Sequence, residues 1–221
     1  NGAVTVQGAA RFTLTESDVT GDVRLEGGDG AQVTVSKVNG VIRIVDAVAH
    51  VLIDGNTASA LEVTAPGGAG ASDLRVHNNA LRSITLGAAA SGDIRGNRIS
   101  GGSIGLVISA AFDGLIADNL IESGLGVQYD AAAALIGNTI RGTSTGIRTS
   151  VAGAGALGFV AGSGVNRIED IDRRVLSVPG VRHLGHQRHR VLGDRQVAMR
   201  ERNSELKKNK LDRGMMYSDI H

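Results

Sequence analysis

The chain has 221 residues, a formal net charge of +1 and no Cys. Without Cys, disulfides and thiolate metal sites are excluded. Hydrophobic residues make up 42% of the sequence but aromatic residues only 2%, so any core must be built from aliphatic side chains. No apolar run approaches the roughly 18 residues of a membrane-spanning helix, and no membrane span is expected.

The charge is divided unevenly along the chain. Residues 1–170 carry 11 Lys and Arg against 16 Asp and Glu, whereas residues 171–221 carry 12 against 6, together with four of the six His. Such a division indicates a change of organisation near residue 170. We therefore expect one domain over residues 1–175 and a basic appendix over residues 176–221. Because the sequence begins with Asn1 and not Met, we expect it to be a processed or excised segment.

The first 50 residues hold five short segments in which apolar and polar residues alternate. The segments are AVTVQG, RFTLT, DVRLEG, AQVTVS and VIRIVD. Alternation with period two predicts β-strands. We expect these strands to form the first coils, with a partly covered edge, of the architecture that the next 120 residues define.

A phrase built on Asn recurs between residues 50 and 170. An aliphatic residue stands three positions before the first five Asn, and another stands two positions after five of the six. Successive Asn are 23, 18, 22, 19 and 28 residues apart. The six positions are Asn56, Asn79, Asn97, Asn119, Asn138 and Asn166.

A strand-like segment follows each of the first five Asn. These segments are ALEVT (60–64), SITLG (83–87), GLVIS (105–109), GVQYD (126–130) and GIRTS (146–150). Short alternating strands at a period near 20 residues favour an all-β fold, a parallel β-solenoid of about seven or eight coils over a sandwich. One coil cannot bury its own apolar face, so the core forms by stacking.

The recurring Asn has two interpretations. At the bend of each coil, Asn tolerates left-handed backbone geometry, and its amide can bond to the Asn of the next coil and to the turn backbone. Alternatively the Asn residues are ligands or catalytic amides. Repetition favours the structural ladder, because a catalytic amide is needed once and not six times.

The phrase hydrophobic-x-x-Asn-x-Ile, with a later Gly-hydrophobic-x-hydrophobic, resembles the right-handed parallel β-helix repeats of pectate-lyase-like proteins. The resemblance covers about residues 50–170, more weakly residues 1–50, and not the tail. It implies a right-handed, single-stranded β-helix. That group includes polysaccharide lyases, hydrolases and epimerases, phage tailspikes and surface proteins without known activity. Its catalytic motifs Asn-Thr-Asp, Asp-Asp, Gly-His-Gly, Arg-Ile-Lys and Asp-Pro-His-Asp do not occur in this sequence.

The outward positions of the second phrase should form a row along the solenoid. The row is Glu62, Thr85, Val107, Gln128 and Arg148. With about 4.8 Å between coils, Gln128, Asp130 and Arg148 could share one patch and hold an anionic sugar through paired hydrogen bonds. The alternative is a solvated sheet face whose charges offset one another. Neither a platform of aromatic rings for sugar stacking nor a metal or cofactor site is expected.

After residue 175 the alternation ends and basic residues dominate. His183, His186 and His189 could ligate zinc on one helix face, but an exposed basic stretch is favoured. Residues 196–210 have helix-forming composition and could cap the last coil, as an irregular or short helical tail. No aromatic residue interleaves the basic ones, so nucleic-acid binding is not favoured.

The sequence thus predicts a non-enzymatic β-helix scaffold or binding protein, extracellular or at the cell surface, and a fragment of a longer chain. A glycan is the expected ligand class. A polysaccharide-active lyase, hydrolase or epimerase with an atypical site through Gln128, Asp130 and Arg148 is the first alternative. A solenoid that associates with copies of itself through its edges is the second.

Overall fold

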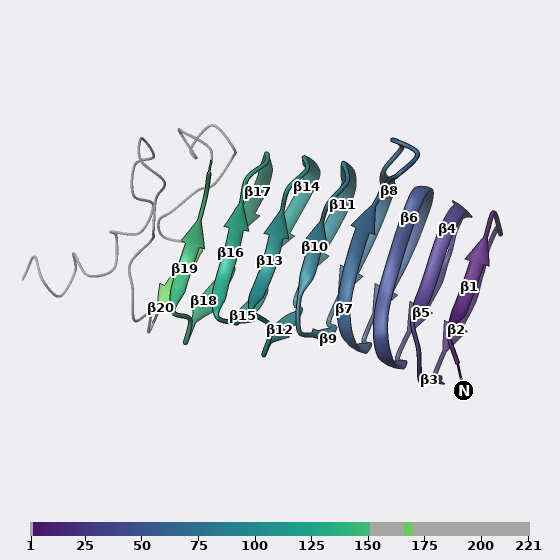
Figure 1. Cartoon of the computed structure of the whole chain (residues 1–221), viewed down its shortest axis with the longest axis horizontal. Coiled ribbons are helices and arrows are strands. Elements are labelled where there is room, and N and C mark those ends of the chain that lie inside the picture. The colour runs from purple at the N-terminus through teal and green to yellow at the C-terminus, as the bar shows by residue number, and fades with distance from the viewer. Residues whose placement is uncertain (1, 151–165, 170–221) are drawn as a thin grey trace, which may run out of the picture. The chain divides into compact units, whose positions relative to one another are not determined.

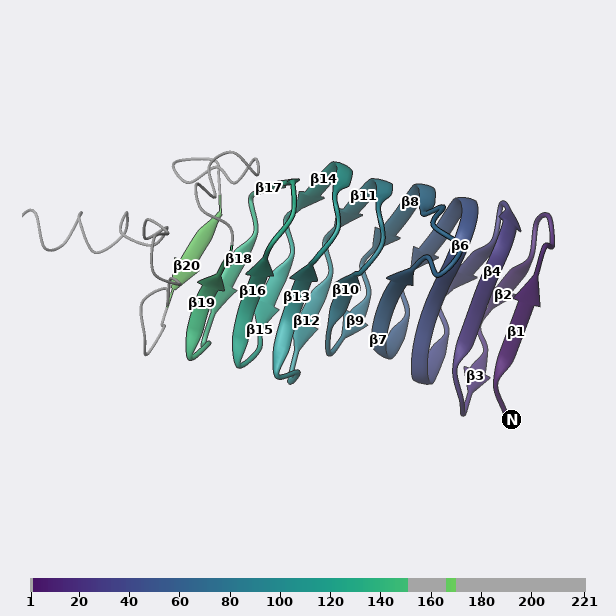
Figure 2. The same ribbon diagram turned by 45° about the horizontal axis from the view of Figure 1, so that its top comes forward.

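The computed structural model describes residues 2–150 and 166–169. Within them the chain winds into a parallel β-solenoid of about seven coils, and every pairing between the described strands is parallel. Figures 1 and 2 show the strands of successive coils side by side in chain order. The predicted all-β solenoid is confirmed over these residues, including the expectation that the first 50 residues form its first coils.

The coils present three faces, which we call A, B and C. Face A contains β1 (Val4–Gln7), β4 (Val23–Asp29), part of β6 (Lys37–Asp54), β7 (Thr57–Thr64), β10 (Ile84–Leu86), β13 (Ile104–Ile108), β16 (Leu125–Tyr129) and β19 (Thr145–Arg148). Face B contains β2 (Thr13–Thr15), β5 (Gln32–Thr34), the end of β6, β8 (Ala71–His77), β11 (Ala90–Arg95), β14 (Phe112–Ala117) and β17 (Ala133–Ile136). Face C contains β3 (Asp18–Val19), the starts of β6 and β7, β9 (Ala80–Leu81), β12 (Arg98–Ser100), β15 (Leu120–Glu122), β18 (Thr139–Arg141) and β20 (Arg167–Glu169).

The core is a set of aliphatic rows that run along the solenoid, one residue per coil. On face A the inward row is Val23, Ile42, Leu61, Ile84, Leu106, Val127 and Ile147, all 0% exposed. Tyr129 also points inward, and its hydroxyl donates to the carbonyl of Ala133 at 2.6 Å. Burial raises the pKa of Tyr129 to about 12, so this phenol stays neutral and packs as part of the core.

The predicted Asn ladder is present. Its first five Asn are at most 1% exposed. The Oδ1 of each Asn from Asn79 to Asn166 accepts two hydrogen bonds, at 2.7–3.1 Å, from the backbone N–H and the Nδ2 of the Asn one coil earlier. Each Nδ2 also donates, at 2.6–3.0 Å, to the carbonyl three positions before the ladder residue of the preceding coil. The amide groups are thereby satisfied in an otherwise apolar interior.

Two Ser residues extend the ladder toward the N-terminus. The backbone N–H of Ser36 donates to Oδ1 of Asn56 at 2.9 Å, and the backbone N–H of Ser17 donates to Oγ of Ser36 at 3.1 Å. The Oγ of Ser36 itself donates within its own coil, to the carbonyl of Thr34 at 2.8 Å. The Ser hydroxyl therefore replaces the amide oxygen of Asn as an acceptor, but it supplies one donor where the Asn amide supplies two.

The residue before each ladder position has a left-handed backbone conformation. That preceding residue has a φ between 46° and 69° in seven successive coils, at Glu16, Val35, Gly55, Asn78, Gly96, Asp118 and Gly137. The prediction that the ladder Asn itself adopts left-handed geometry is wrong. The ladder amide must point into the core, so the reversal of chain direction falls one residue earlier, where the side chain can leave toward solvent.

Val35 is the one β-branched residue among these seven, with φ 48° and 62% of its surface exposed. A β-branched side chain in this region costs about 1–2 kcal/mol. We expect Val35→Asn to raise the free energy of unfolding by about 1 kcal/mol, because Asn78 adopts the same backbone geometry two coils later. Chemical denaturation measures the change. Val35→Thr, which keeps the branched Cβ, should give no gain, and an equal gain from Thr would assign the effect to lost apolar exposure instead.

Candidate functional site

The predicted outward row exists on face A. Glu62 pairs with Thr85, Thr85 with Val107, Val107 with Gln128, and Gln128 with Arg148 in neighbouring coils. The row is set by period-two alternation, because the residues on either side of each of these positions face the core.

Gln128, Asp130 and Arg148 lie in one patch, as the spacing predicted. The Nε2 of Gln128 donates to Oδ2 of Asp130 at 2.7 Å, and Nη2 of Arg148 donates to Oε1 of Gln128 at 2.9 Å. The other Asp130 oxygen accepts from the backbone N–H and the hydroxyl of Ser150, both at 2.8 Å. The side chains are therefore linked to one another, in the order Arg148, Gln128, Asp130 and Ser150.

The Asp130 carboxylate is held in its charged form. Partial burial raises its pKa, but the hydrogen bonds from Ser150 and Gln128 and the charge of Arg148 together outweigh that effect, so the pKa lies below its ordinary value. A general acid needs a pKa raised toward the working pH. The shift of the Asp130 pKa is in the opposite direction.

The lowered pKa of Asp130 predicts a pH-dependent stability difference. Above the pKa of an unfolded Asp, about 4, the native carboxylate contributes its full stabilisation, and this is lost as pH falls through the lower native value. We expect Asp130→Asn to cost about 1 kcal/mol at pH 7 and clearly less near pH 2, as the native carboxylate becomes protonated. Urea denaturation at the two pH values measures this difference. A constant difference at both pH values would mean that charge is irrelevant at this position.

On the same face, Arg43 is paired along the solenoid with carboxylates of both neighbouring coils. Arg43 contacts Asp22 of the preceding coil, and its Nε lies 3.0 Å from Oε2 of Glu62 in the following coil. A backbone hydrogen bond from Val41 and then the Arg43 contact lower the pKa of Asp22. This half of the face fits the alternative interpretation, in which outward charges offset one another across coils.

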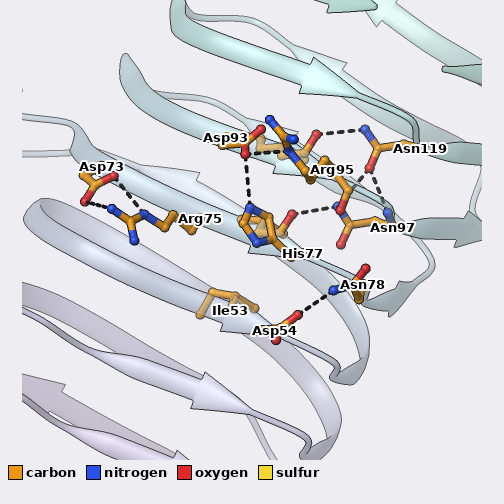
Figure 3. Close-up of polar contacts among 12 residues, drawn as sticks. Ile53, Asp54, Asp73, Arg75, His77, Asn78, Asp93, Arg95, Asn97 and Asn119 are labelled. Atoms are coloured by element: carbon orange, nitrogen blue, oxygen red, sulfur yellow. Dashed lines mark hydrogen bonds and ion pairs between the residues drawn. The ribbon is translucent and has the colours of Figure 1, made fainter. Parts of the chain in front are cut away.

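A second charged group, on face B, was not anticipated. Asp93 lies between Nε2 of His77 in the preceding coil, at 3.3 Å, and Nε of Arg95 in its own strand, at 2.6 Å (Figure 3). The side chains of Asp93 and His77 are only 26% and 25% exposed. Nearby, Nδ2 of Asn78 donates to Oδ1 of Asp54 at 3.0 Å. Aligning the repeats on Asn places His77 and Arg95 at equivalent positions, two residues before Asn79 and Asn97. The sequence could therefore have predicted that these two residues lie side by side in neighbouring coils.

Other expectations concern features that the described residues cover only in part. Among residues 2–150 and 166–169, no group of three or more His, Asp and Glu side chains is arranged to hold a metal ion. No helix long and apolar enough to cross a membrane occurs in the same residues. The domain boundary at residues 175/176, the His183, His186 and His189 group and the helix expected over 196–210 lie outside the described residues.

Comparisons with known proteins assign no family to this chain. No protein-family model, no curated protein and no solved structure matches the chain. What the residues themselves establish is a parallel β-solenoid with an internal asparagine ladder.

Proposed function

We propose that this chain is a non-enzymatic β-solenoid scaffold that binds ligands through its exterior, of the exported or cell-surface kind and related to the pectate-lyase-like β-helix proteins. The observation that supports this most is the bonding of Asp130. Both of its oxygens accept hydrogen bonds from neighbouring side chains or backbone, and its pKa is lowered. A carboxylate in that state serves as a fixed acceptor for a ligand better than as a proton donor.

The interior supports the same proposal. The repeated residues interact with one another inside the solenoid. The Asn amides form hydrogen bonds from coil to coil, and the aliphatic rows are buried. Charged side chains, by contrast, lie at outward positions and in turns. A binding role needs such an exterior, held rigid by a repeated frame.

The rival proposal is a polysaccharide-active enzyme, and it has a specific observation in its favour, because the three residues it requires do meet in one patch. The test is incubation of the purified chain with a panel of acidic polysaccharides, with and without calcium, followed by measurement of new unsaturated or reducing ends. We expect no turnover. Turnover that Asp130→Asn abolishes would replace the scaffold by the enzyme.

A further inference from the structure

We propose that the outer edge of the first coil binds the same edge of a second copy of this chain, so that two solenoids join as a two-fold symmetric dimer. The edge consists of β1 on face A, β2 on face B and β3 on face C, at the end of the stack that is marked N in Figures 1 and 2. The inference goes beyond the scaffold proposal, which concerns ligands on the faces of the solenoid and not its ends.

Each strand of the first coil is paired on one side only among the described residues. β1 pairs with β4, β2 with β5 and β3 with β6. On face A, the backbone N–H groups of Val4 and Gly8 donate to carbonyls of the second coil at 2.8 and 2.9 Å. Because the backbone groups of successive residues point to opposite sides of a strand, those of Thr5 and Gln7 point away from the second coil. The edge therefore offers backbone donors and acceptors to a further strand.

The inward side chains of the first coil are covered on one side only. Val4 and Val6 are partly exposed, whereas the residues that pair with them in the second coil, Val23 and Leu25, are 0% and 1% exposed. The partly buried apolar residues that pack against the core from this coil are Val4, Val6, Phe12 and Leu14. The aliphatic rows thus end in apolar surface, and its removal from water by a further coil would favour association.

A second copy of the chain is the partner that matches this edge. Each boundary between coils combines strand pairing with stacked apolar side chains, and the outer edge of the first coil presents the same two features on more than one face. A single extended peptide would pair with one strand and leave the apolar residues of the other face uncovered. A solenoid of the same cross-section covers the whole edge and continues the contacts by which the coils already stack.

The sequence of β1 suits pairing with itself. It reads Val-Thr-Val-Gln, with no charged residue to repel its copy and no Pro to interrupt the hydrogen bonds. In an antiparallel pair, Thr5 lies opposite Gln7 of the second copy, and their backbone N–H and C=O groups bond reciprocally. Val6 then lies opposite Val6 of the second copy, in a non-hydrogen-bonded pair that extends the apolar row from Leu25. Such a self-complementary contact closes as a dimer.

Analytical ultracentrifugation of the full chain between about 1 µM and 1 mM, the range in which unpaired strand edges associate, tests the proposal. We expect a monomer–dimer equilibrium. Thr5→Pro should weaken dimerisation at least tenfold, because Pro lacks the N–H that bonds to the second copy, while no hydrogen bond within the chain uses that N–H. Thr5→Val keeps the N–H and is the matched control, so it should dimerise as the wild type does. Circular dichroism at the lowest concentration shows whether both variants are folded.

A single introduced Cys locates the contact, because the chain has no Cys of its own. A non-hydrogen-bonded antiparallel pair places its Cα atoms about 4.5 Å apart, within reach of a disulfide. Val6→Cys should therefore form a covalent dimer on mild oxidation. Ile136→Cys, at a residue of face B that is 40% exposed, is the matched control and should form at least tenfold less. Electrophoresis without reducing agent measures both, and this comparison decides the matter if Thr5→Pro does not fold.

Several results would overturn the proposal. They are a monomer throughout the concentration range, a dimer that a folded Thr5→Pro leaves intact, and equal cross-linking of the two Cys variants. Assemblies that grow beyond the dimer would show head-to-tail stacking in place of two-fold pairing. Each of these results would leave the scaffold proposal standing, because polysaccharide turnover is measured separately.

Discussion

Replacing Asn119 with Leu is expected to cost about 3–5 kcal/mol of stability. The substitution removes the Oδ1 that accepts from the backbone N–H and Nδ2 of Asn97 at 3.0 and 2.8 Å, and the Nδ2 that donates to Ile94 and Asn138. A buried N–H and a buried carbonyl lose these partners in a region from which water is excluded. Urea denaturation of the purified variant measures the loss.

Asn119→Ser is the matched control for this experiment. Ser36 occupies the same place in an earlier coil, and its hydroxyl accepts a backbone N–H as the Asn amide does. The Ser variant should therefore lose clearly less stability than the Leu variant. Binding of any exterior ligand should be unchanged in whatever fraction stays folded. Equal costs for Ser and Leu would mean that the acceptor is not the stabilising part of the ladder.

Gly114→Ala is the second substitution for which a large loss is expected, about 3 kcal/mol or more. Gly114 has φ 149°, and a Cβ at this position would overlap the carbonyl oxygen of Gly92 in the preceding coil. The Gly92 carbonyl carbon and nitrogen would also lie within 3.0 Å of it. The obstacle is backbone, which cannot rotate away as a side chain can, so the two coils would have to separate locally.

Gly101→Ala separates backbone strain from this clash. Gly101 has φ 80°, and an added Cβ there would meet no heavy atom within 4 Å. It should cost only the conformational term, about 1–2 kcal/mol. Thermal or urea denaturation of the two variants side by side gives the comparison. Similar losses for both would show that the close approach of Gly92 and Gly114 is relieved without difficulty.

Most of the fold could be predicted from the sequence, because the core residues and the ladder residues recur in every coil. The Asn phrase and the alternation after it identify the inward residues from Leu61 to Ile147, and all are buried. The ladder positions of Ser17 and Ser36 were missed, since one Ser among many polar residues has no distinctive spacing until the Asn rows are extended backward. The left-handed residue was misplaced by one position, because the amide and the bend compete for the same short segment.

The candidate sites could be predicted only where they follow the repeat. Gln128, Asp130 and Arg148 come together because each is outward in the same phrase of adjacent coils. The contact of Asp93 with His77 joins positions that are not equivalent in the repeat, four and two residues before their ladder Asn. Local sequence does not specify which side chains of neighbouring coils will pair in this way. The hydrogen bonds that lower the pKa of Asp130 likewise depend on Ser150, from the next coil.

The asparagine ladder makes the boundary between one coil and the next chemically the same from Asn56 to Asn138. In each boundary the earlier coil offers two N–H groups to an amide oxygen, and the later coil returns one N–H to a carbonyl. Loss of residues 97–118 would join Gly96 to Asn119 and restore the same contacts between the coils that become neighbours. A chain of this kind can therefore lose or gain whole coils. Its outer faces become shorter or longer, while the contacts between neighbouring coils stay the same.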